Sequence, residues 1–179
     1  MKRLVPGITL AIALTVALVT SASAAQDPFL AKLVGTWIGR GAMVQSADAK
    51  AERLYCKVTN TLSEDGTTLN QAGRCSLASA SGPIDGHIKA GADNTYSGTL
   101  ASIGSRGPAT LAGGLADNAD KKKVLRLNTE YIDKLSGAPV KAVNTLELLP
   151  DGGYSLTATR TNPADGKEYT SSKVVFSAN

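Results

Sequence analysis

Aromatic residues, histidine and cysteine are all scarce in this sequence of 179 residues, and each shortage excludes a class of function. Phe, Trp and Tyr together make up 4% of the chain, and Lys121-Lys122-Lys123 is the only basic run. The chain therefore lacks the stacking platform and the basic stripe of a nucleic-acid-binding surface. The one histidine, His87, is too few for a typical zinc or haem site. We expect no bound nucleic acid, metal or cofactor.

Long apolar runs are also absent, except at the N-terminus. Lys2 and Arg3 precede a largely apolar segment, residues 4–20, and Ala22-Ser23-Ala24 supplies a small-x-small cleavage site. This pattern is typical of a secretory signal peptide. We predict a signal peptide at residues 1–24, a single mature domain at residues 25–179, and a periplasmic or secreted protein of a Gram-negative bacterium.

An uncleaved membrane anchor is the alternative interpretation of this leader. It is less favoured because Pro6, Gly7, Thr9 and Thr15 interrupt the run, whereas a spanning helix needs about 20 apolar residues. No second long apolar segment follows, so we expect no membrane span in the mature chain. Cleavage leaves 155 of the 179 residues, and the formal charge falls from +4 to +2 because Lys2 and Arg3 are removed. This length suits one domain, which we expect to be a monomer.

Cys56 and Cys75 are the only cysteines, and in an exported protein they are expected to form a disulfide. Between them, Asp65-Gly66 predicts a two-residue hairpin turn because glycine accepts a positive φ. Both cysteines are equally far from this turn, so they face each other across the hairpin. The same register places Leu62 opposite Leu69 on the cysteine face. The spacing fits neither a redox C-x-x-C pair nor a zinc site.

Short segments of alternating apolar and polar residues, separated by turn residues, fill the rest of the mature chain. A helical turn is expected near residues 28–34. Strands are expected at 36–45, in the hairpin, near 84–88, 96–100 and 109–115, at 124–133, 140–149 and 154–161, and through 174–176. No helix covers such a sheet, so it must close on itself to bury its apolar side. The sequence therefore predicts an all-β fold, a single antiparallel up-and-down β-barrel of about 8–10 strands.

A family resemblance begins at Leu-Val-Gly-Thr-Trp-Ile-Gly, residues 33–39. Gly35-x-Trp37, after a short helical turn, resembles the opening motif of the lipocalin and calycin barrels. The resemblance implies that Trp37 packs across the closed end of the barrel and that Arg160 is the basic residue stacked on it. Thr129-Glu130-Tyr131 is similar to the family's Thr-Asp-Tyr motif. The chain departs from the family in ending on a strand and in joining adjacent strands by its disulfide.

The interior of the predicted barrel leaves two alternatives open. The many small residues between Gly82 and Gly114 either leave room for a ligand or allow bulges and tight coiling of the sheet. Asn60 and Gln71 face each other on the cysteine side of the hairpin. They are either a buried hydrogen-bonded pair or polar contacts in a ligand pocket.

No catalytic constellation can be assembled from this sequence, and we predict that the protein is not an enzyme. His87 alternates with Ile88 and falls on the outer face, without an acid or nucleophile beside it. The leading hypothesis is an exported lipocalin-like protein that binds a small apolar ligand. The alternative is an exported protein–protein interaction module, such as a protease or lysozyme inhibitor, whose exposed residues 26–32 or loops contact the target.

Overall fold

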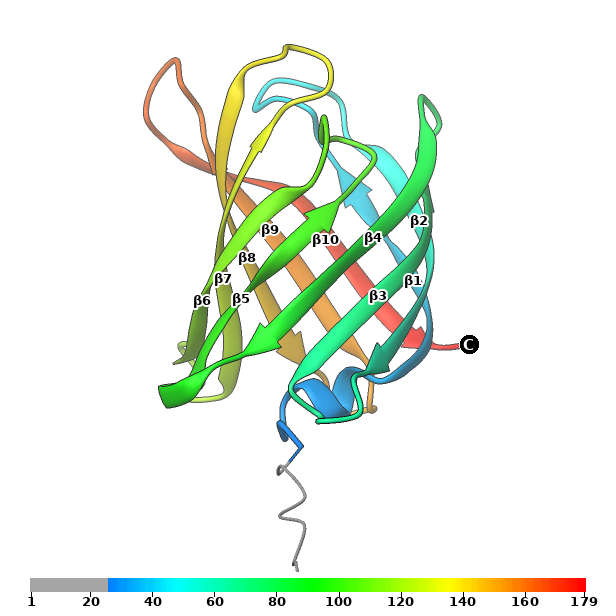
Figure 1. Ribbon diagram of the computed structural model, residues 1–179. Helices are drawn as coiled ribbons and strands as arrows, with labels where there is room; N and C mark the ends of the chain where they lie inside the picture. The colour runs from blue at the N-terminus through cyan, green and yellow to red at the C-terminus, as the bar shows by residue number, and fades with distance from the viewer. Residues whose placement is uncertain (1–25) are drawn as a thin grey trace, which may run out of the picture.

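The computed structural model describes residues 26–179, and the predicted signal peptide, residues 1–24, lies outside them. Ten strands and two short 3-10 helices follow one another along the chain (Figure 1). They are η1 (Leu30–Leu33), β1 (Gly35–Met43), β2 (Glu52–Leu62), β3 (Thr68–Ser76), β4 (Ser81–Ala90), η2 (Ala92–Asn94), β5 (Thr95–Ala101), β6 (Ala109–Asp117), β7 (Lys123–Ile132), β8 (Pro139–Leu148), β9 (Tyr154–Thr161) and β10 (Glu168–Ala178). Within residues 26–179, no helix has the length and apolar character needed to cross a membrane.

The ten strands form one closed antiparallel barrel in which each strand pairs with its neighbours along the chain. β1 closes the barrel because it pairs with β10 as well as with β2. Trp37, for example, lies opposite Ala178 on one side and Val58 on the other. The predicted all-β, up-and-down barrel is thus confirmed, and closure leaves no unpaired sheet edge.

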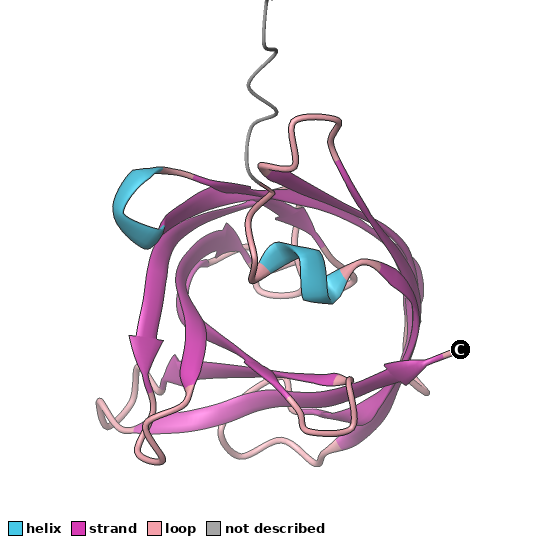
Figure 2. Ribbon diagram, turned by 90° about the horizontal axis from the view of Figure 1, so that it is seen from below, coloured by secondary structure: helices cyan, strands magenta, loops and turns pink. Residues whose placement is uncertain are grey.

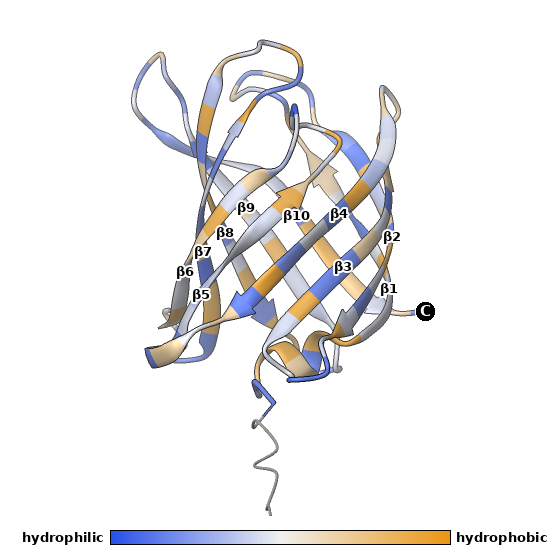
Figure 3. Cartoon of the chain, viewed as in Figure 1, coloured by the Kyte–Doolittle hydropathy of each residue, from blue (hydrophilic) through white to orange (hydrophobic). Residues whose placement is uncertain are grey.

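Side chains alternate between the interior and the outer surface, as the pleat of a strand requires. In β2, the buried residues Leu54, Cys56, Val58 and Asn60 alternate with exposed ones. Figure 3 shows the same alternation of hydrophobic and hydrophilic residues along β3 and β4. The inward side chains form one core within the barrel.

Inward-facing glycines are required where neighbouring strands approach most closely. A Cβ atom on Gly98 would lie 1.9 Å from the carbonyl oxygen of His87, and one on Gly113 would lie 1.9 Å from that of Arg126. Gly86 would meet the Thr99 carbonyl oxygen at 2.3 Å. Tight coiling therefore explains these three glycines in the region from Gly82 to Gly114, and their missing side chains also leave the interior less filled.

The β2–β3 hairpin has the predicted register, with Cys56 opposite Cys75 and the two sulfur atoms bonded. Its turn is wider than the predicted two residues. The Ser63 N–H donates to the Thr68 carbonyl oxygen, which leaves residues 64–67 in the loop. Asp65 itself does not adopt a positive φ, and its carboxylate instead accepts hydrogen bonds from Thr67. The register is unchanged because the wider loop has the same centre.

The segment before β1 closes one end of the barrel, as Figure 2 shows from below. Phe29 and Leu30 are buried in the core. One carboxylate oxygen of Asp27 accepts the N–H groups of both residues, at 3.0 and 2.7 Å, and the other accepts the Tyr96 hydroxyl at 2.9 Å. Phe29 and Leu30, within the predicted contact segment 26–32, are therefore buried rather than exposed, because they plug the barrel, whereas Gln26, Pro28 and Lys32 are exposed.

Candidate functional site

Two adjoining cavities lie inside the barrel. The lower cavity, of about 70 Å³, borders the η1 plug and has mostly apolar walls. The upper cavity, of about 140 Å³, lies toward the opposite end and is bordered by the disulfide. Five inward side chains line both cavities, so the two adjoin each other; these are Ile84, Leu100, Asn144, Leu156 and Phe176.

The upper cavity leads to a depression of about 120 Å³ among the loops opposite η1. Met43, Ile103 and Arg160 line both spaces. The outer wall of the depression includes Lys134 and Leu135, from the loop between β7 and β8. This end is therefore the mouth of the interior, and the end that holds η1 is its base.

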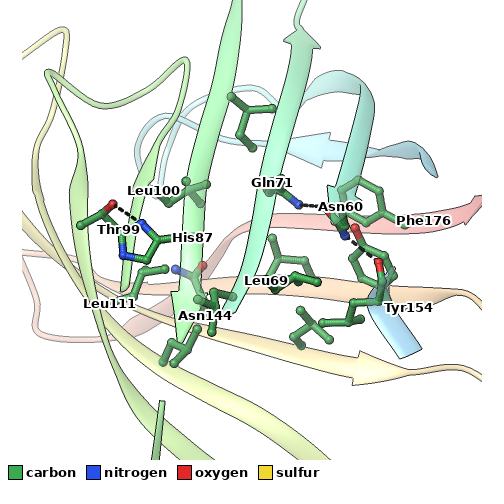
Figure 4. Close-up of a pocket in the computed structure, with 17 residues that line it drawn as sticks. Asn60, Leu69, Gln71, His87, Thr99, Leu100, Leu111, Asn144, Tyr154 and Phe176 are labelled. Atoms are coloured by element: carbon green, nitrogen blue, oxygen red, sulfur yellow. Dashed lines mark hydrogen bonds between the residues drawn. The ribbon is translucent and has the colours of Figure 1, made fainter. Parts of the chain in front are cut away.

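Asn60 and Gln71 are both a hydrogen-bonded pair and part of the cavity wall. Gln71 Nε2 donates to Asn60 Oδ1 at 3.0 Å, and Asn60 Nδ2 donates to the Leu33 carbonyl oxygen at 2.9 Å. Both side chains also line the lower cavity (Figure 4). The pair thus connects the plug to the β2–β3 hairpin and gives the cavity a polar edge.

Trp37 lies at the base of the barrel and lines neither cavity. Its Nε1 donates to the Leu33 carbonyl oxygen at 2.8 Å, and its ring meets Tyr154 edge-on with the ring centres 5.2 Å apart. Gly35, with a φ of +138°, carries the chain from the plug into β1 with the indole packed 3.6 Å from its Cβ position. Phe176 stacks on Tyr154 at 4.5 Å. These contacts form an aromatic floor beneath the cavity.

The Tyr154 hydroxyl is the one buried side-chain polar atom without a hydrogen-bond partner among residues 26–179. Tyr154 is 2% exposed and lines the lower cavity. Burial raises the pKa of this phenol above its ordinary value, and the nearby Asn60 side chain offsets that rise only in part. The Asn60 amide gives one N–H to the Leu33 carbonyl oxygen and accepts from Gln71 through its oxygen, so its second N–H is still available to the phenol. An unpaired buried hydroxyl costs about 1–3 kcal/mol, which a hydrogen-bonding ligand atom would recover.

Arg160 lies at the mouth, so the predicted stacking of Arg160 on Trp37 is wrong. Tyr154 and Arg160 both face inward on β9 but stand at its opposite ends, and it is Tyr154 that contacts Trp37. The Arg160 guanidinium instead lies 5.9 Å from the centre of the Tyr131 ring and 3.9 Å from a carboxylate oxygen of Asp133. The Thr129-Glu130-Tyr131 motif also lies in the mouth half of its strand.

The upper cavity combines an apolar wall with a polar side. Thr129, Ser105 and Ser171 are buried polar residues that line it. Asn144 Nδ2 donates to the Thr129 hydroxyl, and the Ser171 hydroxyl donates to the Ala158 carbonyl oxygen. A bulge in β10 between Thr170 and Ser172 accommodates Ser171. Together with Arg160, these groups make the mouth half of the interior amphipathic.

Among residues 26–179, the structure brings no catalytic group together with His87. The ring is exposed on the outer face of β4, where Nδ1 lies 3.4 Å from the Thr99 hydroxyl, although both residues also line the lower cavity (Figure 4). In the part of the chain described, no cluster of three or more His, Cys, Asp or Glu residues could hold a metal ion. The polar groups that sequence reasoning missed are Tyr154, Tyr131 and Asp133. The period of two along β9 was a usable signal for Tyr154, because it places that residue on the same face as Arg160.

Comparison with known proteins assigns no family. No family model matches this chain, and no curated protein matches it significantly. Any function proposed for the chain therefore depends on the geometry of the barrel itself.

Proposed function

We propose that this protein is exported and binds a small, largely apolar ligand inside its barrel, as lipocalins do. The observation that carries the proposal is a pair of adjoining, mostly apolar cavities, the lower of which is lined by Tyr154 with its unpartnered hydroxyl. Protein interiors are normally close-packed, and their buried polar groups are normally paired. Departure from both rules at one place is typical of a ligand site.

The cavity volume limits the size of the ligand. An engineered apolar cavity of about 150 Å³ admits benzene. The two adjoining cavities here, of about 70 and 140 Å³, therefore suit a molecule of roughly six to ten carbon atoms. The ligand is expected to offer a hydrogen-bonding atom to Tyr154, because the walls around this hydroxyl are otherwise mostly apolar.

The likeness to lipocalins supports the binding mode more than membership of the family. The closed barrel, the short helical plug and Trp37 at the base all agree with the resemblance. The barrel has ten strands, however, whereas lipocalins have eight. Arg160 also lies at the mouth rather than beside Trp37.

A protein–protein interaction module is the second candidate, and one exposed residue favours it. Leu135, in the loop between β7 and β8, has 73% of its surface exposed. An apolar side chain on a loop tip is suited to contact a protein target, whereas the plugging segment is not. This candidate needs no ligand in the interior, so occupancy of the cavity separates the two functions.

The test is binding of octan-1-ol, measured by isothermal titration calorimetry and native mass spectrometry. Ala158 faces inward and lines the upper cavity, so Ala158→Phe is expected to block binding. Ala112→Phe, on the exposed outer face of β6, is the matched control and should bind as the wild type does. Saturable binding that only Ala158→Phe abolishes supports the proposal. If octan-1-ol binds equally to both variants, it does not occupy the interior and the proposal fails.

A further inference from the structure

We propose that the ligand is a monocarboxylate whose carboxylate is bound by Arg160 at the mouth, while its apolar chain extends toward the base. This inference rests on the proposed binding function and names the chemical class of the ligand. Three features of the mouth support it: the burial of the guanidinium, the state of Asp133, and the line of side chains along β9.

Arg160 is a largely buried cation that uses few of its donors on residues 26–179. Only 11% of its side chain is exposed. Its one hydrogen bond to residues 26–179 runs from Nη1 to the Gln45 carbonyl oxygen, at 3.2 Å. A guanidinium carries five N–H donors in a planar fork that matches a carboxylate. Unused donors of this kind, at the boundary between an apolar cavity and its mouth, are suited to hold an anionic head group.

Asp133 balances the charge of Arg160 without occupying these donors. Its closest approach to the guanidinium is 3.9 Å, which is beyond hydrogen-bond distance. Its Oδ1 accepts the N–H groups of Leu135 and Ser136 and the Ser136 hydroxyl. Burial acts to raise the pKa of Asp133, but these hydrogen bonds and the Arg160 charge outweigh it and hold the pKa below its usual value. Asp133 is thus a fixed anion that helps to position Arg160.

The charges at the mouth favour a monoanion. Among residues 26–179, Arg160 is the only cation that lines the upper cavity, and the Asp133 carboxylate is close to it. A dianionic phosphate would leave a net charge of −2 in this largely buried site, at a much greater desolvation cost than the −1 that a single carboxylate leaves. Lys134 is exposed on the outer depression, where it favours the approach of an anion from solvent.

A path for the apolar chain follows β9 from mouth to base. Its inward positions are Arg160, Ala158, Leu156 and Tyr154 in that order. The small side chain of Ala158 leaves space next to the guanidinium, and Leu156 borders both cavities. A chain anchored by its carboxylate at Arg160 therefore passes through the upper cavity toward the aromatic floor.

The experiment compares octanoate with octan-1-ol, which differ only in the head group. By calorimetry near neutral pH, we expect octanoate to bind wild-type protein at least tenfold more tightly than octan-1-ol. Arg160→Met should weaken octanoate binding at least tenfold and leave octan-1-ol unchanged, which also shows that the variant is folded. Arg126→Met, on the exposed outer face of β7, removes the same charge elsewhere and should change neither affinity.

A second readout uses the wild-type protein alone, so it does not depend on the folding of a variant. NMR of carboxyl-labelled octanoate should give a lower pKa for the bound acid than for the free acid, because Arg160 favours the charged form. If both molecules bind equally and Arg160→Met has no effect, the carboxylate assignment fails while the binding function stands. If neither molecule binds, the proposed function fails as well.

Discussion

Loss of the Cys56–Cys75 bond should destabilise the barrel by an amount that follows from its place in the chain. The cysteines are 19 residues apart, and closing a loop of this length removes unfolded-state entropy worth about 3 kcal/mol at 25 °C. For a domain of this size, 1 kcal/mol shifts the melting temperature by about 2–4 °C. We therefore expect reduction to lower the melting temperature by about 6–12 °C.

Reduced wild-type protein is the cleaner comparison because it keeps both sulfur atoms in the core. Urea unfolding followed by circular dichroism, with and without reductant, gives the free energy of unfolding and its dependence on denaturant. The dependence, m, should be larger for reduced protein, because an unfolded chain without the bond exposes more surface. A Cys56→Ala/Cys75→Ala variant should lose somewhat more stability, since it also removes buried atoms. A melting temperature that falls by less than 2 °C on reduction would refute this reasoning.

Three further predictions follow from single contacts. Gly113→Ala should lower the free energy of unfolding by about 1–3 kcal/mol, because its Cβ would meet a backbone oxygen. Gly104→Ala, whose Cβ meets only the flexible end of Met43, should lower it by less than about 1 kcal/mol. Chemical denaturation compares the two variants, and equal losses would contradict the close-approach explanation. Tyr154→Phe should leave the stability of ligand-free protein unchanged or slightly raised, since its hydroxyl lacks a partner, and a loss above about 1 kcal/mol would reveal a hydrogen bond. Hydrogen bonds from the Ser63 hydroxyl and from Thr67 lower the pKa of Asp65 to about 2 from 3.8. The contribution of the Asp65 carboxylate to stability should therefore be complete above pH 4 and disappear as the pH falls toward 2. NMR titration measures this pKa, and a value near 3.8 would be inconsistent with these hydrogen bonds.

The hairpin was predictable because several local signals agreed on one register. The turn at Asp65-Gly66, the two cysteines and the apolar pairing each indicated the same alignment, and a one-residue slip would have moved every side chain to the opposite face. The pairing of Asn60 with Gln71 followed from this register. Closure of the barrel was predictable for a different reason, since a sheet without helices must bury its apolar side within itself.

Contacts between distant segments were not predictable in the same way. The family resemblance predicted that Arg160 stacks on Trp37, but the distance between the two side chains depends on the end of β9 at which Arg160 lies. Arg160 does face the interior, as stacking on Trp37 would require, but it lies at the mouth end of β9 while Trp37 lies at the base. The burial of Phe29 and Leu30 was not predicted, because the few apolar side chains of residues 26–32 have no periodic pattern. Their burial depends on the open end of the barrel that they fill, and on the hydrogen bond that the Tyr96 hydroxyl donates to Asp27.

The two ends of the barrel differ in a way that favours a ligand site over an unfilled core. At the base, Leu33 accepts hydrogen bonds from both Trp37 and Asn60, so the plug is firmly attached. At the mouth, Arg160 keeps most of its donors free. An empty lower cavity of about 70 Å³ costs about 2 kcal/mol, which one larger side chain could remove. A barrel with a purely structural role gains nothing from that loss, whereas a ligand that fills the space and pairs with Tyr154 and Arg160 recovers it.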